Sequence, residues 1–518
     1  MKTLRDQVIR NSSVNVASFS WQALLSFFIT PYIIWRIGNA AFGLWAVVYS
    51  IVTFCSLLDF DLAQAFVKYV AEYNASKEMK KLNQVVNTGL VLYLAFGAAV
   101  VAVVWVAAPA IIGIFPEVFV EKALYGDGLF VLKIAALIYA METGLSALTC
   151  IPRGVQRLDI EKIVLTVKVT LDALGTVIVL ELGHGIKGLV ITYLITSALA
   201  CFVKIILAFR LLPTLRLSPS FVSVATVKHL FPFCWRLEVM KFSQWSNLRL
   251  DKILIGYFIS LEAVTLYHLG SVVVGFVRRV PTLFLAALMP AFSELSVSRS
   301  AREFHASVVR ATKYIALVAV PMAFFLGCAA GKIMEGWMGP GYEASANVIR
   351  ILVVGYCASI AAGGGLSSAV IGMGRPGVQM KASVLNAVLN TVLSVALILR
   401  LGFYGAPLGT TIAMVVAVVY FMARFQGLFS REDRTPFTGI YLKVVVAGGA
   451  ACLVFPVIEA LLGPLGVASR LTVLLRLSVD GACYVFLCLA MLMITGYFDE
   501  RDRLMLSKFA PLTGWRKK

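Results

Sequence analysis

The stretch "QVVNTGLVLYLAFGAAVVAVVWVAA", residues 84–108, contains no Asp, Glu, Lys or Arg. A helix needs about 20 mostly apolar residues to cross the hydrocarbon core of a bilayer. The sequence supplies runs of about this length repeatedly along its 518 residues. Hydrophobic residues make up 60% of the chain and charged residues 14%, whereas soluble domains have about 45–50% and about 25%. The sequence therefore predicts an all-α integral membrane protein.

The apolar runs and the breakers between them predict about fourteen transmembrane helices. The basic segment before the first run is followed by no small-residue cleavage pattern, so we expect a retained first helix. The helices are expected at roughly residues 14–35, 41–60, 84–108, 128–150, 162–181, 187–211, 229–258, 262–291, 308–331, 344–370, 378–400, 404–428, 438–462 and 470–497.

Lysine and arginine are distributed unequally among the predicted loops. If the N-terminus is cytoplasmic, that side collects Lys77, Lys80 and Lys81 and the basic residues of the tail, and the opposite side keeps few. The positive-inside rule then predicts two cytoplasmic termini. We assign most of the net charge of +19 to orientation and to anionic lipid headgroups, and expect no nucleic-acid partner.

The chain resembles itself at an offset of about 220 residues. "LAQAFVKYVAEYNASKEMKKLNQ" from Leu62 matches "LMPAFSELSVSRSAREFHAS" from Leu288, and "PRGVQRLD" from Pro152 matches "VIGMGRPG" from Val370. "GHGIKGL" from Gly183 matches "FYGAPLG" from Phe403. A duplication predicts two six-helix lobes with a binding site between them. The expected parts are an N-terminal lobe (1–215), a C-terminal lobe (216–432), an additional helix pair (433–498) and a basic cytoplasmic tail (499–518).

The segment "FCWRLEVMKFSQWSNLRLDKILIG", residues 233–256, is unusually charged for a predicted spanning helix. An intramembrane charge costs about 2.5–3.5 kcal/mol on the insertion scale, so several together require water or countercharges. The excess of basic over acidic groups favours the wall of a cationic cavity, and internal salt bridges with interfacial anchors are the alternative. The candidate substrate-binding residues are Arg236, Lys241, Arg249 and Lys252.

Further candidates lie on other predicted helices. Asn15, Gln22 and Ser26 recur with Ser18 on one face of the first helix, where substrate binding and hydrogen bonding between packed helices are both open. Arg278 and Arg279 lie well inside the eighth helix, and one of them is expected to line the cavity. Ion coupling is a further hypothesis, and its candidates are Asp59, Asp61 and Asp251.

Several polar residues are instead expected to be structural. Lys168 and Asp172 have i,i+4 spacing, so we expect each to neutralise the charge of the other. We expect the same of Arg476 and Asp480. The nine cysteines and four histidines are scattered, which predicts no disulfide framework, metal site or cofactor.

The motifs "GNAAFGLWAVVYSI" from Gly38, "LDFDLAQAFVKYVAEY" from Leu58, "LDKILIGYFISLEAVTLYHLG" from Leu250 and "LMPAFSEL" from Leu288 resemble the Wzx-type polysaccharide flippases. Their superfamily includes the lipid II flippase MurJ and the MATE exporters. The resemblance covers essentially the whole chain, and it departs at Asp61, where the family more often has Gly.

The resemblance implies alternating access in the cytoplasmic (inner) membrane, with an undecaprenyl-diphosphate-linked oligosaccharide as substrate. It places the first, second, seventh and eighth helices along the cavity and the lipid tail near the last two. Membrane lipids, a polysaccharide polymerase and export machinery are the other expected partners, and coupling to an H+ or Na+ gradient or to the membrane potential is open. A lipid II flippase, a MATE-type antiporter and a membrane polymerase or ligase are the alternative functions.

Overall fold

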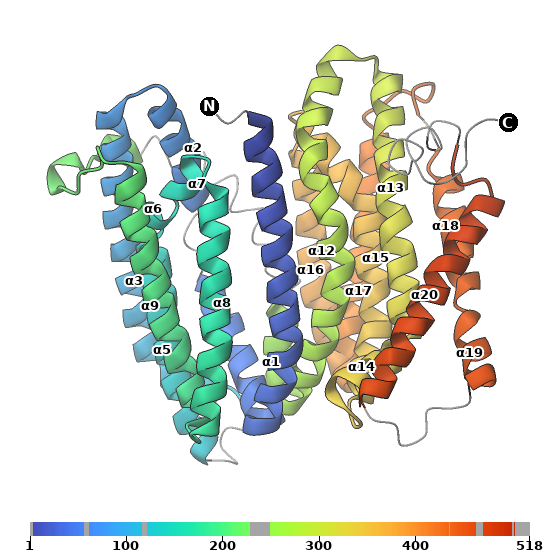
Figure 1. The fold of residues 1–518 in the computed structure, drawn as a ribbon, viewed down its shortest axis with the longest axis horizontal. Coiled ribbons are helices and arrows are strands. Elements are labelled where there is room, and N and C mark those ends of the chain that lie inside the picture. Colours follow the sequence, from blue (N-terminus) through green and yellow to red (C-terminus); the bar gives the residue numbers. More distant parts are fainter. Residues whose placement is uncertain are drawn as a thin grey trace. The chain divides into compact units, whose positions relative to one another are not determined.

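The computed structural model describes residues 4–55, 62–116, 122–227, 249–434, 436–462, 470–499 and 502. Within these ranges every regular element is a helix, and no strand occurs (Figure 1). Eleven of the described helical segments are long and apolar enough to cross a membrane. The prediction of an all-α, multi-pass membrane protein is confirmed, and the number fourteen stays a prediction.

The chain forms two compact units, Met1–Thr265 and Leu266–Lys518, and the boundary falls inside one helix, α12. The predicted lobes and additional helix pair stay a prediction. The first unit contains α1 (Leu4–Phe54), α2 (Leu62–Ala75), α3 (Met79–Gly113), α5 (Lys122–Gly144), α6 (Ser146–Thr149), α7 (Ile151–Gly154), α8 (Leu158–Glu181), α9 (Gly185–Leu211), the 3-10 turn η2 (Pro219–Phe221), α11 (Asp251–Phe258) and the start of α12 (Leu261–Ser298).

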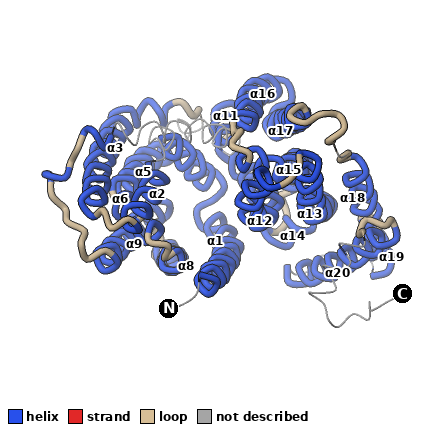
Figure 2. The backbone as a smooth tube through the Cα atoms, turned by 90° about the horizontal axis from the view of Figure 1, so that it is seen from above, coloured by secondary structure: helices blue, strands red, loops and turns tan. Residues whose placement is uncertain are grey.

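The second unit begins within α12 and continues through the C-terminal helices. It contains α13 (Ala301–Cys328), α14 (Ala330–Met338), α15 (Glu343–Gly372), α16 (Gly377–Leu401), the 3-10 turn η4 (Gly402–Tyr404), α17 (Gly405–Gln426), α18 (Thr438–Ala451), α19 (Val454–Leu462) and α20 (Arg470–Ile494). The view in Figure 2 shows α18, α19 and α20 grouped together beside α13 in this unit.

A glycine separates the first two predicted helices, which otherwise run on as α1. Gly38 has φ 83° and ψ 165° inside this helix, a conformation that glycine adopts without steric cost. The predicted gap between residues 35 and 41 is therefore a sharp change of direction at one residue rather than a loop.

The helix α2 corrects one expectation from the sequence. We expected the second helix to end near residue 60 and a cytoplasmic charged segment to follow, but Leu62–Ala75 is helical and packed. Phe66, Tyr69 and Val70 are buried, because apolar residues at i, i+3 and i+4 give the helix one apolar face. The ring of Phe66 lies against Gly89 of α3, where a methyl group would meet it at 2.1 Å.

The segment after α9 is bound along the start of α3. The side-chain oxygen Oδ1 of Asn83 accepts from the Arg216 amide at 2.7 Å. The Asn87 side chain donates to the Arg216 carbonyl at 2.8 Å and accepts from the Ser218 amide at 2.9 Å. These buried amides satisfy backbone groups that would otherwise lack partners. The Ser223 amide also donates to the hydroxyl of Thr88 at 3.0 Å, so the chain that leads toward the charged segment 233–256 is bound to α3 as far as residue 223.

In the second unit, buried polar groups hold α20 to its neighbours. Tyr484 donates to the carbonyl of Pro321 in α13 at 3.0 Å, and its hydroxyl lies 3.2 Å from the carbonyl of Gly448 in α18. Asp480 pairs with Lys332 of α14 at 3.0 Å. The expected pairing of Asp480 with Arg476 is therefore wrong, because a cation 148 residues away is placed closer by tertiary packing. Arg476 donates to the carbonyl of Ile458 at 2.9 Å.

A further buried carboxylate fixes the start of the C-terminal tail. Asp502 accepts from Tyr314 at 2.5 Å and pairs with Lys313, both on α13. Burial raises the pKa of this carboxyl, but the hydrogen bonds from Lys313 and Tyr314 outweigh it and hold the pKa below its usual value. The tail therefore begins from a point bound to α13.

Candidate substrate-binding site

The charged segment reaches the described part of the structure at Arg249. The guanidinium carbon of Arg249 lies 4.8 Å from the centre of the Tyr49 ring on α1, within the range of a cation–π contact. Arg249 is half-buried, so its charge is partly accessible. An arginine that is oriented by an aromatic face and still partly exposed is suited to bind an anionic group.

Asp251 and Lys252 have different surroundings from Arg249. They begin α11, and only 1% of Asp251 and 5% of Lys252 is exposed. Buried charges of opposite sign usually compensate each other or nearby groups. Arg249 lies two residues before α11 begins, and it is the most accessible of these three predicted site residues.

A close contact between backbones holds this segment against the second half of α1. A methyl group on Gly43 would lie 1.8 Å from the carbonyl oxygen of Leu261. The hydroxyl of Thr265 donates to the carbonyl of Asn39 at 2.7 Å. Gly256 packs against the side chain of Val47, from which a methyl group on Gly256 would lie 3.1 Å. The chain that follows Arg249 is therefore held by packing against the part of α1 that precedes Tyr49.

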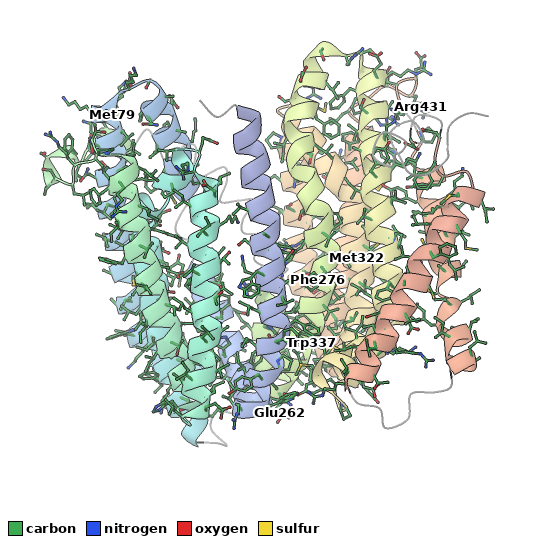
Figure 3. The ribbon with its side chains drawn as sticks, in the orientation of Figure 1. Met79, Glu262, Phe276, Met322, Trp337 and Arg431 are labelled. Atoms are coloured by element: carbon green, nitrogen blue, oxygen red, sulfur yellow. The ribbon has the colours of Figure 1, made fainter. Side chains whose placement is uncertain are left out.

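Arg278 and Arg279 lie on the part of α12 that belongs to the second unit. Arg278 is half-buried and Arg279 is exposed. Pro281 has no amide proton to donate, and the hydroxyl of Thr282 donates to the carbonyl of Arg279 at 2.7 Å. Phe276, labelled in Figure 3, lies on the same helix just before the two arginines.

The polar stripe of α1 is partly used for packing. Ser18 and Thr166 of α8 share a hydrogen bond of 2.8 Å, and Gln22 donates to Ser18 at 3.0 Å. Asn15 is half-buried and Ser26 is exposed. Hydrogen bonding between packed helices therefore accounts for Ser18, whereas the bond of Gln22 lies within α1. Among the described residues, no hydrogen bond joins Asn15 or Ser26 to α8.

The pair Lys168–Asp172 is confirmed, with the two atoms 3.0 Å apart. Thr196 of α9 also donates to Asp172, and the ammonium group of Lys168 lies 5.4 Å from the centre of the Tyr193 ring. Beside this network, an apolar groove of about 410 Å³ runs between α8 and α9. Its lining residues are Ile160, Ile163, Val164, Val167, Lys168, Leu171, Thr196, Leu199, Ala200, Val203 and Leu207.

Four predicted site residues lie outside the described residues, namely Arg236, Lys241, Asp59 and Asp61. Among the residues that are described, no group of three or more His, Cys, Asp or Glu is placed to hold a metal ion.

Tyr49 and Thr196 are contacts that the sequence alone did not predict. Each lies in an apolar run, and its role depends on a partner from another part of the chain. Arg249 follows Tyr49 by 200 residues, and Asp172 lies on α8 whereas Thr196 lies on α9. The sequence indicates only that a buried charge needs a polar or aromatic neighbour, and it does not indicate which residue that neighbour is.

The fold and this site define a multi-pass, all-helical membrane protein in which Arg249 lies against Tyr49 of α1 in the first unit. Its sequence matches the family described as polysaccharide biosynthesis protein over residues 36–347. The chain belongs to this family, which confirms the resemblance to the Wzx-type flippases.

Solved structures of the MOP superfamily share the fold. The lipid II flippase MurJ, in an inward closed conformation, has 14% identity and a TM-score of 0.69, and the match covers 93% of this chain and 98% of MurJ. An inward-facing multidrug resistance MATE transporter has 13% identity and a TM-score of 0.65, covering 80% of this chain and 97% of the transporter. No curated protein matches the sequence.

Proposed function

We propose that this protein is a flippase that moves an undecaprenyl-diphosphate-linked oligosaccharide across the cytoplasmic membrane for polysaccharide biosynthesis. The observation that carries the proposal is the family match over residues 36–347, which contains the cationic segment. The protein changes the side on which the lipid-linked sugar lies and makes or breaks no covalent bond. It needs no cofactor.

The basic residues give this substrate a binding site of matching charge. A diphosphate carries several negative charges, and arginine binds phosphate oxygens through two parallel N–H groups. Arg249 is supported by its partial exposure beside Tyr49. Arg236, Lys241, Lys252 and one of Arg278 and Arg279 are the further cations of the proposal.

The uncharged parts of the substrate would meet different surfaces. Sugar hydroxyls need neutral donors and acceptors, which Asn15, Gln22 and Ser26 offer on α1. The prenyl chain would remain in lipid between the lobes or along the last two helices. Alternating access of the two lobes would then carry the polar group across.

Orientation and energy source complete the proposal. Both termini are cytoplasmic by the distribution of Lys and Arg. An H+ or Na+ gradient or the membrane potential drives transport, with Asp59, Asp61 and Asp251 as the coupling candidates. Polysaccharide polymerase and export machinery would receive the translocated product.

The second candidate is a MATE-type exporter, which the fold likeness favours. A site for cationic drugs should be lined by acids and aromatic residues, whereas the segment 233–256 has four basic and two acidic residues. The MurJ match covers 93% of this chain and the MATE match 80%. The MurJ match thus covers 13% more of the 518 residues, which is about 67 residues. The predicted additional helix pair, residues 433–498, has about the same length. Lipid II remains the alternative lipid-linked substrate.

The proposal is tested by charge removal in cells that depend on this protein for polymer export. Arg249→Ala, Arg236→Ala, Lys241→Ala and Arg278→Ala should each reduce the exported polymer at normal protein levels. Arg249→Lys keeps the charge and is the matched control for Arg249→Ala. Full export in all four alanine variants would place the diphosphate site elsewhere, and drug resistance without a polymer defect would favour the exporter.

A further inference from the structure

Two cysteines from distant parts of the sequence meet in the second unit. Cys328 is the last residue of α13, and Cys452 lies in the short break between α18 and α19. Their sulfur atoms are 2.9 Å apart, although 124 residues separate them in the chain. The sequence suggested no such pair, because each cysteine lies in its own apolar run.

Close packing of α13 and α18 brings the two thiols together. Gly448 and Gly449 of α18 face the ring of Phe324, and a methyl group on Gly448 would lie 2.9 Å from it. Cys452 follows one turn later, and its thiol lies 3.8 Å from the carbonyl oxygen of Phe324. Small residues allow helix backbones to approach closely in membranes. The contact between the sulfur atoms is thus a result of the packed interface.

We propose that Cys328 and Cys452 form a disulfide bond that fastens the C-terminal helices α18 and α19 to α13. An S–S bond is about 2.0 Å long, so the thiols must approach by only about 1 Å, which side-chain rotation can supply. The proposal concerns a modification site of the chain and does not depend on the identity of the transported substrate.

The bond would form by exchange with a disulfide-bearing oxidant. Cys328 is exposed and Cys452 is half-buried, so the Cys328 thiol loses its proton and attacks the oxidant, releasing one thiol of the oxidant. The Cys452 thiolate then attacks the Cys328 sulfur and releases the second thiol. The two cysteines lose two protons and two electrons, and the oxidant disulfide is reduced to two thiols.

The predicted topology places this pair where such a bond persists. With a cytoplasmic N-terminus and eight predicted helices before it, α13 runs from the cytoplasmic side outward. Cys328, at its last residue, then lies at the non-cytoplasmic end, and oxidising conditions outside the cytoplasm maintain disulfides.

The disulfide is tested with a protease site inserted in the full-length protein between Arg431 and Glu432. Both residues are exposed in the loop between α17 and α18, and Figure 3 shows Arg431 at the opposite end of the second unit from Trp337 of α14. Cutting there separates Cys328 from Cys452. Thiols in cells are first blocked with N-ethylmaleimide, and the cut protein is then run on a denaturing gel with and without reductant.

We expect the two fragments of the wild-type protein to remain joined without reductant and to separate with it. Cys328→Ser and Cys452→Ser should each separate without reductant, whereas the control Cys483→Ser, from the same helix cluster, should stay joined. Wild-type fragments that separate without reductant would overturn the proposal. Fragments of Cys328→Ser that stay joined would overturn it as well, because another cysteine would then form the bond.

Discussion

The α8–α9 hairpin of the first unit and the α16–α17 hairpin of the second share a plan but bury different polar groups. Each joins two long helices through a turn that contains a glycine with positive φ, Gly183 in one and Gly402 in the other. The α8–α9 hairpin buries the ion pair of Lys168 and Asp172. The other hairpin buries neutral groups, with Ser394 donating to Asn390 at 2.9 Å.

The two hairpins also differ in how closely their helices approach. A methyl group on Gly409 of α17 would lie 2.6 Å from the backbone nitrogen of Ser394. In the first hairpin, a methyl group on Gly175 would meet the side chain of Thr192 at 2.5 Å, and an apolar groove remains between the helices. The comparison indicates that backbone contact holds α16 to α17, whereas side chains hold α8 to α9, among them Thr196 of α9, which donates to Asp172 of the ion pair on α8.

The largest expected effect comes from breaking the ion pair. Asp172→Ala removes the partner of Lys168 in a site where only 6% of Asp172 is exposed. Loss of one partner from a buried pair costs about 3–5 kcal/mol. Thermal unfolding of the purified protein in detergent should show a large fall in Tm.

The double variant Lys168→Met/Asp172→Leu is the control for this prediction. Replacing a buried pair by apolar groups is often neutral or stabilising, so its Tm should return close to the wild-type value. If the double variant is as unstable as Asp172→Ala, the pair has a role beyond mutual neutralisation.

The next effect compares the two glycines. Gly409→Ala forces a methyl group against backbone and should cost about 1–3 kcal/mol as an overpacked contact. Gly175→Ala meets the side-chain methyl group of Thr192, which can move without displacing backbone, and should cost less. Equal losses of Tm in the two variants would contradict the proposed difference between the hairpins.

The smallest effect concerns the neutral network. Asn390→Ala removes the acceptor of Ser394, and hydrogen bonds between membrane helices contribute about 0.6 kcal/mol on average and up to about 1.7. The expected fall in Tm is therefore well below that of Asp172→Ala. A loss as large as that of Asp172→Ala would show that neutral and ionic networks contribute equally.

The helical fold could be predicted because apolar runs determine it locally. The run from residue 84 to 108 lies wholly inside α3, and Gly38 marks a break that the sequence placed correctly. The sequence did not predict α2, because the charged residues on its polar face indicated a cytoplasmic loop. Its buried residues Phe66, Tyr69 and Val70 carried the opposite signal at helical spacing.

The candidate site could be predicted only in part, since its contacts join residues far apart in the chain. The local pair Lys168–Asp172 was predicted correctly from i,i+4 spacing. Asp480 was assigned to Arg476 by the same rule, but its partner Lys332 comes from α14. Spacing identifies a pair on one helix, and packing between helices decides whether a nearer partner exists.

The most direct test of the central claim is translocation by the purified protein in liposomes. A fluorescent undecaprenyl-diphosphate-linked oligosaccharide is incorporated, and an impermeant quencher added outside reports the fraction that has crossed. We predict faster crossing with the wild-type protein than in protein-free liposomes, and slower crossing with Arg249→Ala at equal reconstitution. A wild-type rate equal to that of protein-free liposomes would contradict the proposed function.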